Sequence, residues 1–340
     1  MDSPPNSEGT DKPDGRTFRL LRRVRILWPP IAGACVGIVL RILYSGGPRQ
    51  PYNAMASSFV LLAPIVVAAV SVYMAELSER RSWFYYFKIG AAANVLFVAG
   101  TFLILIEGLV CVIIAAPLFA LIGGLGGLAA GAVFRSVRWP RHTMYGLTAL
   151  PILLGALEPL RSPPHEVESV SRTLTIPAQA HEVWQQLLTA RQIAPGEIDS
   201  AWMYRIGVPP PLSAETELRA GELVRHIVMG RAIHFDQVSR DWVTDRRVRW
   251  TYRFQEDSIP AGALDDHVKI GGEYFDLIDA TYSIVDTPAG SELTVEMRYR
   301  VSTDFNWYAV PVARVLVGNF ESAALAFYAH RATHSGGAAP

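Results

Sequence analysis

The sequence of 340 residues has few cysteines and few charged residues, and each scarcity excludes a class of protein. Its two cysteines, Cys35 and Cys111, lie in apolar runs, so the chain is not a small domain built on a disulfide framework. Charged residues make up 18% and hydrophobic residues 50% of the chain. The mean hydropathy of +0.21 is high for a protein that is entirely surrounded by water.

The sequence also lacks an excess of positive charge. It has 31 Lys and Arg against 31 Asp and Glu, and residues 161–340 carry 17 of the basic and 23 of the acidic residues. A nucleic-acid-binding domain needs basic side chains to neutralise phosphates. The acidic second half therefore excludes nucleic acid as a partner.

The sequence also lacks the short motifs that are typical of enzymes. The sequence shows no nucleophile elbow, no phosphate-binding glycine loop and no Cys/His spacing typical of a metal site. We therefore expect no metal, no cofactor and no assignable catalytic residue. Function has to be inferred from architecture.

Long uncharged runs dominate residues 26–160, which we expect to form a transmembrane helical domain behind a disordered basic tail, residues 1–25. A span needs about 20 apolar residues, because a helix rises about 1.5 Å per residue through a core of about 30 Å. Ile89–Phe134 would reach about 69 Å, which fits two crossings with a turn at Glu107. The sequence predicts five spans: Ile26–Tyr44, Ser57–Ala75, two within Ile89–Phe134, and the weakest, Thr143–Leu160.

Glycines recur at four-residue spacing within these runs. Small residues at this spacing let helix backbones approach closely in lipid. Transport usually requires intramembrane ionisable groups, and only Glu107 qualifies here. The bundle is therefore predicted to be an anchor that packs through Gly33, Gly37, Gly123, Gly127 and Gly131.

The basic residues predict the orientation of the spans. With five spans, one side receives twelve Lys and Arg, and the other receives about two, Arg41 and Arg49. Because cytoplasmic loops are enriched in these residues, the N-terminus should be cytoplasmic. Five spans then place residues 161–340 outside the cytoplasm, whereas a fifth segment lying on the surface would leave them inside.

Residues 168–333 follow a different pattern, after a linker at 161–167 and before a flexible tail at 334–340. Val170–Ile176 alternates as a half-buried strand does, and Ala180–Leu188 has a helical stripe. A long apolar helix is predicted from Trp307 to Ala332. Further strands are predicted at Leu223–Met229, Ala232–Val238, Val248–Phe254, Tyr274–Val285 and Leu293–Val301. The layout is α+β, with an antiparallel sheet wrapped on a long C-terminal helix.

Three segments carry a resemblance to a known group. They are SRTLTIPAQAHEVW (171–184), HVKIGGEYFD (267–276) and STDFNWY (302–308). Over about residues 167–333 the chain resembles the START-like, or SRPBCC (polyketide cyclase-like), helix-grip superfamily. The last two segments resemble a membrane-anchored, uncharacterised bacterial subgroup, which implies an inner or plasma membrane location. Members of this superfamily range from lipid carriers to cyclases, so the resemblance implies a fold and not an activity.

A cavity between sheet and helix is the default ligand site in such a fold. In Val248–Phe254 and Leu293–Val301, aromatic and apolar residues occupy one face and charged residues the other. A solid core explains these apolar faces equally well. The candidate lining residues are Trp202, Trp250, Tyr252, Phe275, Met297, Tyr299, Trp307 and Tyr308.

Three polar residues on neighbouring predicted strands are further candidates: His226, His234 and Asp236. Such a set can transfer protons or hold zinc. Its predicted face also carries Val224 and Val228, however, so a structural role is the more economical interpretation.

Three functions remain open from the sequence. The first is a membrane-anchored module that binds an apolar small molecule or a lipid, with the bilayer as its other partner. The second is a cyclase- or dehydratase-type enzyme, which needs an acid–base pair pointing into the cavity. The third is a non-catalytic envelope protein whose interior is filled and which binds other proteins.

Overall fold

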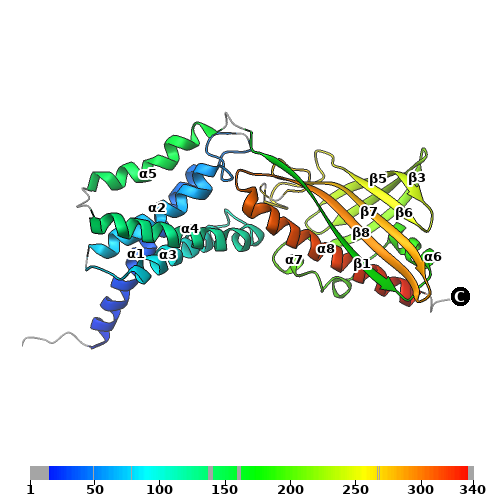
Figure 1. Ribbon diagram of the computed structural model, residues 1–340, viewed down its shortest axis with the longest axis horizontal. Coiled ribbons are helices and arrows are strands. Elements are labelled where there is room, and N and C mark those ends of the chain that lie inside the picture. Colours follow the sequence, from blue (N-terminus) through cyan, green and yellow to red (C-terminus); the bar gives the residue numbers. More distant parts are fainter. Residues whose placement is uncertain are drawn as a thin grey trace, which may run out of the picture. The chain divides into compact units, whose positions relative to one another are not determined.

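The computed structural model describes residues 15–48, 50–77, 79–136, 141–158, 162–265, 267 and 269–335, with the side chains of 15–26 and 141–145 left aside. Two compact units are present (Figure 1). The first comprises residues 1–45, 58–100 and 116–154, and the second comprises 46–57, 101–115 and 155–340. Most of the expected tails, residues 1–14 and 336–340, lies outside the described residues.

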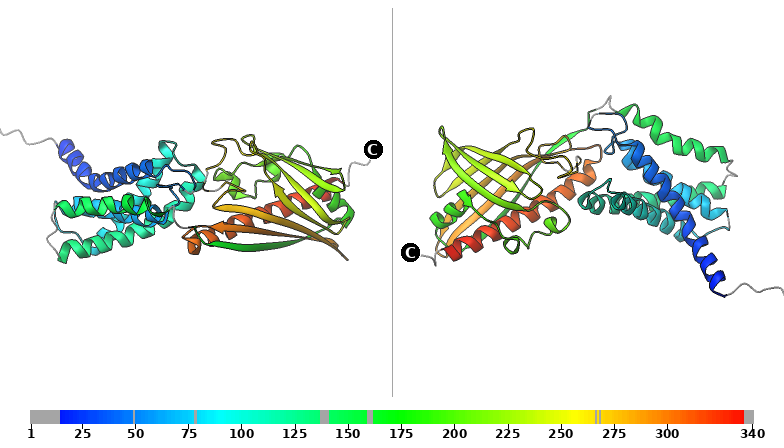
Figure 2. Two further views of the ribbon diagram at one scale, coloured as in Figure 1. Left: turned by 90° about the horizontal axis from the view of Figure 1, so that it is seen from above. Right: turned by 180° about the vertical axis from the view of Figure 1, so that it is seen from behind.

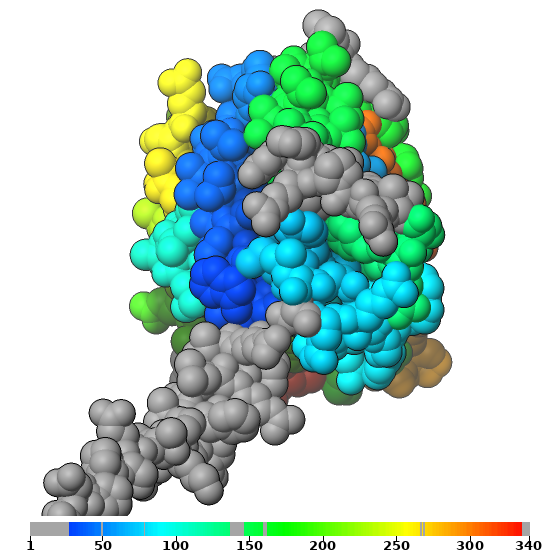
Figure 3. All heavy atoms as spheres, turned by 90° about the vertical axis from the view of Figure 1, so that its left-hand side faces the viewer, coloured from blue at the N-terminus to red at the C-terminus, as the bar shows by residue number. Residues whose placement is uncertain are grey.

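The first unit is helical. Its helices α2, α3 and α4 are apolar around most of their circumference, as helices that cross a membrane are. The helix α1 begins at Gly15, so the basic segment 16–25, which was expected to be disordered, is helical. Figure 3 faces this unit, with α1 in blue and residues around the α2–α3 turn in cyan. The helices are α1 Gly15–Leu43, α2 Ser57–Glu76, α3 Trp83–Leu103, α4 Leu109–Ser136 and α5 Arg141–Gly155.

The expectation of five spans is wrong in number. Among the described residues, four helices are long and apolar enough to cross a membrane: α2, α3, α4 and Asn306–His334. The last of these packs on the sheet of the second unit. Within the described side chains, α1 and α5 contribute shorter apolar helices, Leu27–Leu43 and Gly146–Gly155. Because α5 has 15 residues and ends at Gly155, before Glu158, it reaches only about 22 Å.

Glycines bring α3 and α4 together, as their spacing predicts. A Cβ atom at Gly123 would collide with the Asn94 side chain, and one at Gly127 would collide with the carbonyl oxygen of Tyr86. The Asn94 amide donates hydrogen bonds to the carbonyl oxygens of Pro64 (3.0 Å) and Gly90 (2.9 Å), which links α3 to α2. The contact therefore depends on the absence of side chains along this face of α4.

Replacing Gly127 with Leu should separate α3 from α4, because the new side chain meets backbone atoms that cannot rotate away. We expect a loss of about 1–3 kcal/mol in stability. Thermal unfolding of the full chain in detergent measures it. Gly146→Leu is the matched control, since no atom lies within 4 Å of a Cβ built there. Equal unfolding temperatures for the two variants would contradict the close contact.

The second unit contains an eight-stranded sheet in the order β1-β8-β7-β6-β5-β4-β3-β2. Figure 2 shows this sheet, with the terminal helix in red and orange against it, from two further sides. All neighbouring strands are antiparallel. The first strand returns to pair with the last, from His165 opposite Ser302 to Ile176 opposite Ser291. The strands are β1 His165–Ile176, β2 Thr189–Ala190, β3 Pro211–Arg219, β4 Glu222–Met229, β5 His234–Val243, β6 Arg247–Arg253, β7 Phe275–Thr287 and β8 Gly290–Ser302.

The six strands predicted from the sequence are confirmed in position, and the two-residue strand β2 and the strand β3 were missed. Strand β3 is the longer of the two. Its sequence, PLSAETELR, contains no aromatic residue and only one β-branched residue, Thr216, whereas strands are usually rich in both. It lies near the edge of the sheet, where one face and most of its length stay exposed. Strand β1 also begins five residues before the predicted Val170, inside the expected linker.

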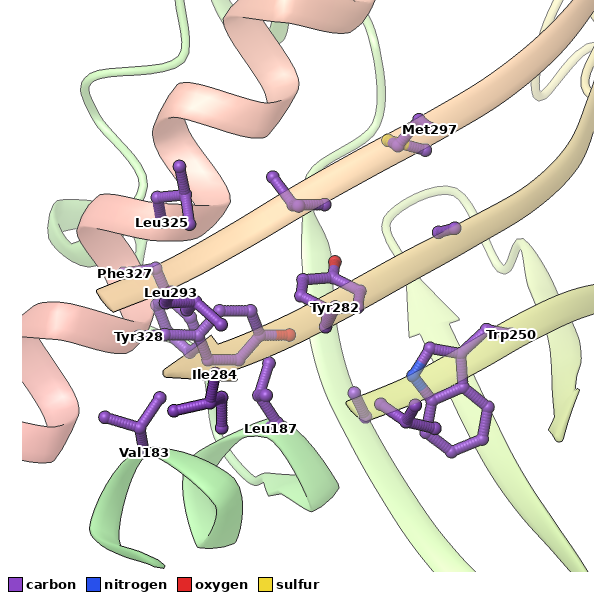
Figure 4. Packing of buried hydrophobic residues seen from close by; sticks show 14 of the residues in the cluster. Val183, Leu187, Trp250, Tyr282, Ile284, Leu293, Met297, Leu325, Phe327 and Tyr328 are labelled. Atoms are coloured by element: carbon purple, nitrogen blue, oxygen red, sulfur yellow. The ribbon is translucent and has the colours of Figure 1, made fainter. Parts of the chain in front are cut away.

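Two helices cover the inner face of the sheet: α6 (Ala180–Leu188) and α8 (Asn306–Ser335). Helix α8 packs on β1 and β8, and α6 packs against α8. Val183 and Leu187 of α6 lie beside Ile284 and Leu293 of the sheet, whereas Trp250 lies further along it (Figure 4). A four-residue helix, α7 (Trp202–Arg205), also contacts α8.

Candidate functional site

Two apolar clusters occupy the inner face of the sheet. The larger lies beneath α6 and α8, and the smaller lies where the loop 255–264 covers the ends of β4 and β5. Along β4, Leu223 belongs to the larger cluster and Met229 to the smaller one. Arg225 lies between them on the same face, because side chains two residues apart on a strand point the same way.

A row of polar side chains crosses four strands at this point. Thr216 of β3 is opposite Arg225, Arg225 is opposite Gln237 of β5, and Gln237 is opposite Tyr252 of β6. Directly paired residues of an antiparallel sheet share a face. The row Thr216–Arg225–Gln237–Tyr252, here called the polar row, therefore lies on the inner face between the two apolar clusters.

Arg225 is the charged member of the polar row and is only 3% exposed. Its Nη2 donates to the hydroxyl of Tyr328 on α8 at 2.7 Å, and its Nη1 lies 3.5 Å from Oε1 of Gln237. The guanidinium carbon lies 5.7 Å from the ring centre of Trp250, within range of a cation–π contact. In the described part of the chain, no carboxylate forms an ion pair with Arg225.

The tyrosines around Arg225 do not supply the missing negative charge. Burial raises the pKa of Tyr252, Tyr282 and Tyr204 above the ordinary value of 10.0. These hydroxyls are therefore neutral at physiological pH. Burial acts to lower the pKa of Arg225, but the tyrosine oxygens, Tyr328 first, outweigh it and the net pKa is raised. The interior consequently keeps a full positive charge.

Further hydrogen-bonding atoms in this region are buried without a partner. Within the described residues, these include Nε of Arg225, Oγ1 of Thr216 and Nε1 of Trp250. Two of the three can only donate a hydrogen bond, and the Thr216 hydroxyl can donate or accept. Because most buried polar atoms in proteins find a partner, this part of the interior is suited to an acceptor from outside the chain.

Burial varies along the inner face of the sheet. The inner side chains of β8 are fully buried from Leu293 to Tyr299. Those of the middle strands, Ile227 and Tyr252, keep accessible surface, as does Tyr204 of α7. On α8, Phe320 and Ala324 are also only partly buried. Accessible inner surface therefore occurs beside the polar row, and also at Leu174 of β1 and at Phe275 and Leu277 of β7.

Most of the lining residues predicted from the sequence lie on the inner face. Trp250, Met297 and Tyr299 are buried in the larger cluster, and Tyr252 and Phe275 pack against it. The rings of Phe275 and Tyr299 are 5.9 Å apart. The remaining three lie elsewhere: Trp202 and Trp307 are exposed, and the hydroxyl of Tyr308 donates to the carbonyl of Ile114 at 2.6 Å.

The predicted polar candidates lie on the outer face of the sheet. His226 and Asp236 are directly opposite each other, with Nδ1 2.7 Å from Oδ1, and the Asp236 hydrogen bond raises the pKa of His226. The ring of His226 also lies 3.5 Å from Glu217, and His234 lies 3.5 Å from Asp257. The structure brings His226 and Asp236 together, but not with the interior, because their strand phase is opposite to that of Arg225.

A second group could hold a metal ion. Among the described residues, Glu107, Cys111 and Asp265 each place one ligand atom within 4.8 Å of the others. His267 lies beside them, with Nε2 3.6 Å from Oε1 of Glu107. All four belong to the second unit. Sequence spacing missed the group because its two halves are about 155 residues apart and no short motif joins them.

The chain is similar to solved structures, but not to a family model or to a curated protein. No family model and no curated protein matches the chain. Protein NE0264 from Nitrosomonas europaea is 13% identical, with 50% of this chain and 97% of that chain covered and a TM-score of 0.30. The di-domain ARO/CYC StfQ from the steffimycin biosynthetic pathway is 11% identical, with 58% and 60% covered and a TM-score of 0.32. An AHSA1-like protein from Aeromonas hydrophila is 11% identical, with 50% and 94% covered and a TM-score of 0.29.

At these identities and TM-scores the matches carry no argument about activity. The strand order and the long terminal helix on the inner face identify the fold by themselves. The second unit is a helix-grip domain. This agrees with the fold that the resemblance implied, whereas the membrane-anchored subgroup is not tested by these matches.

Arg225 and its partners were not predicted as site residues. In LVRHIVM (223–229) both strand faces contain apolar residues, so alternation alone does not say whether Arg225 or His226 points inward. Tyr328 was assigned to the apolar stripe of the terminal helix, without a polar role. Arg225 has the same strand phase as Leu223 and Met229, which was the available indication that it points inward. Only the pairing of β4 with β5 establishes that direction.

One acidic side chain is also fully buried on the inner face. Glu321 of α8 is 0% exposed, and its Oε1 accepts a hydrogen bond from the Met297 amide at 3.1 Å. Its Oε2 has no hydrogen-bond partner in the described part of the structure. Burial raises the pKa of Glu321 from 4.5 to about 7, opposed by the Met297 hydrogen bond and by Arg172.

This raised pKa predicts a pH-dependent stability. The folded chain holds the Glu321 proton up to about pH 7, whereas the unfolded chain releases it near 4.5. The free energy of unfolding should therefore fall as pH rises through this window, by about 3 kcal/mol at most. Glu321→Gln should flatten the fall, so that it stabilises the full chain more at pH 8 than at pH 5 in thermal unfolding.

Glu256→Gln is the matched control for this experiment, because Glu256 is exposed in the loop after β6. It should leave the pH profile unchanged. A Glu321→Gln variant with the wild-type profile would show that Glu321 is not protonated in the folded state near neutral pH.

Proposed function

We propose that this protein is a membrane-anchored helix-grip module that binds a small molecule or lipid with a large apolar part, between the middle strands of the sheet and α8. The observation that carries the proposal is the difference between the two sides of the interior. The side chains of β8 are sealed beneath α8, whereas Ile227, Tyr252 and Ala324 keep accessible surface although they face inward.

The composition of this region suits a mainly apolar ligand. Aromatic side chains with polar tips provide large contact areas and a few hydrogen bonds, which is typical of small-molecule sites. Trp250, Tyr252 and Tyr204 have this character here. The third function left open by the sequence is a non-catalytic envelope protein with a filled interior. That function does not explain why inner side chains of the middle strands keep accessible surface.

Catalysis has less support than binding. A cyclase- or dehydratase-type reaction needs an acid–base pair directed into the interior. The His226–Asp236 pair faces outward, and Tyr252 and Tyr282 hold their protons because burial raises their pKa. We therefore propose binding or carriage as the function, with the bilayer as the source of the ligand. Tethering near the bilayer raises the effective concentration of a hydrophobic ligand at the site.

We also propose that the helix-grip domain lies outside the cytoplasm. The amide of Tyr52 donates to the carbonyl of Gly155 at 3.4 Å, and the Ser57 hydroxyl donates to Glu158. The domain therefore begins beside the turn 46–57, within the second unit. Helix α2 leads from that turn to the segment with Arg80 and Arg81, and the ends of a spanning helix lie on opposite sides. Basic residues favour the cytoplasm, which supports a location of the domain on the opposite side and requires α5 to cross the membrane.

Alkaline phosphatase, which is active only outside the cytoplasm, tests the orientation when it is fused after Pro340. We expect an active fusion there and an inactive fusion after Arg81. Inactive phosphatase at Pro340, with a fluorescent reporter active at the same position, would place the domain in the cytoplasm and contradict the proposal.

Ligand binding is tested by narrowing the space next to α8. Ala324 faces the sheet and Ala326 is exposed on the same helix, so Ala324→Trp and Ala326→Trp form a matched pair. With 1-hexadecanol as the probe and the full chain in detergent, native mass spectrometry should show bound alcohol for the wild type and for Ala326→Trp. Ala324→Trp should bind roughly tenfold more weakly or worse, because the indole occupies the ligand's volume.

Absence of hexadecanol binding by the wild type would contradict the proposed function. So would equal binding by both variants, provided that each unfolds at a temperature close to that of the wild type.

A further inference from the structure

Arg225 carries a buried positive charge, and no described residue pairs with it as a negatively charged partner. Buried charges in proteins are ordinarily paired, because removing a charged group from water costs several kcal/mol. Arg225 is only 3% exposed and has no ion pair among the described side chains. Its known contacts are the hydroxyl of Tyr328, the amide oxygen of Gln237 and the ring of Trp250.

These contacts orient the guanidinium but do not neutralise it. Gln237 is uncharged, and burial keeps the nearby Tyr252 and Tyr282 protonated. Glu321, the buried acid of α8, accepts the Met297 amide on the β8 side and forms no ion pair with Arg225. The Nε of Arg225 has no hydrogen-bond partner in the described structure, so one edge of the fork remains available.

We propose that Arg225 binds the anionic head of an amphipathic ligand whose apolar part lies against the neighbouring aromatic side chains. The inference rests on the proposed function and names the class of ligand. A carboxylate or a phosphate monoester suits a guanidinium because two of its oxygens can accept from two N–H groups of the planar fork. Thr216 adds a hydroxyl beside Arg225, and Trp250 adds an indole N–H.

The surrounding residues explain why the ligand should be amphipathic. Leu223 and Trp250 lie on one side of the polar row, and Ile227 and Phe235 lie on the other. A small inorganic anion would leave these apolar surfaces uncovered, whereas an alkyl or aromatic body would cover them. The apolar contribution grows with the buried area, and the head group adds selectivity.

Three probes with the same chain length test this: hexadecanoate, hexadecyl phosphate and 1-hexadecanol, each titrated into the full chain in detergent and followed by native mass spectrometry. The wild type should prefer one or both anions over the alcohol by about tenfold or more, as charge-assisted hydrogen bonds predict. The preferred anion then distinguishes a fatty-acid carboxylate from a phosphate head.

Arg225→Met should abolish this preference while it keeps binding of the alcohol. Arg225→Lys retains the charge but not the planar guanidinium, so its preference for the anions should lie between those of the wild type and Arg225→Met. It replaces Arg225→Met in the test if that variant does not fold. Arg253→Gln is the matched control, because Arg253 is exposed on β6, in the phase opposite to Tyr252.

The outcomes separate the two proposals. Equal affinity of the wild type for all three probes would overturn the role of Arg225 but leave the proposed function intact. An anion preference that persists in both Arg225 variants would also overturn the role of Arg225 and leave the proposed function intact. Failure to bind any of the three probes would overturn the proposed function itself.

Discussion

A positive charge enclosed between a sheet and a helix is the constraint around which the second unit is arranged. Arg225 is nearly fully buried, and its guanidinium is held by residues from three different elements. Burying a cation is tolerated only when its hydrogen bonds are made and its charge has a use or a partner. The direct contact with Tyr328 also fixes the C-terminal part of α8 relative to β4, so the charge positions the helix that covers the sheet.

The strands at the β1 end of the sheet and those in its middle differ in pairing and in burial. Strands β1, β7 and β8 form long antiparallel ladders, β1 and β8 carry most of the contacts with α8, and the inner side chains of β8 are buried from Leu293 to Tyr299. Strands β3 to β6 pair over shorter lengths and contain a bulge between Val238 and Asp241. On the outer face of β6, β7 and β8, Asp279 of β7 forms ion pairs with Arg249 of β6 and Arg298 of β8. The inner face of these shorter strands is where polar groups and accessible surface coincide.

Periodicity predicts the elements of this protein better than it predicts the site. Alternation located five of the strands from Leu223 onward and the first strand, because their β-branched and aromatic residues follow a clear phase. It missed β3, whose polar residues suit an edge strand, and it overestimated α5 by counting beyond Gly155. Arg225 was hidden because β4 is apolar on both faces, so its inward direction follows only from the pairing with β5. Glu107 and Asp265 could not be connected either, because their proximity arises from folding alone.

The most direct test of this account is an experimental structure of the full chain purified from membranes without added ligand. We predict elongated density between α8 and strands β4 to β6, with its polar end within hydrogen-bond distance of the Arg225 guanidinium. A guanidinium bound only by Tyr328, Gln237 and water, with side chains filling the space beside Ala324, would contradict it.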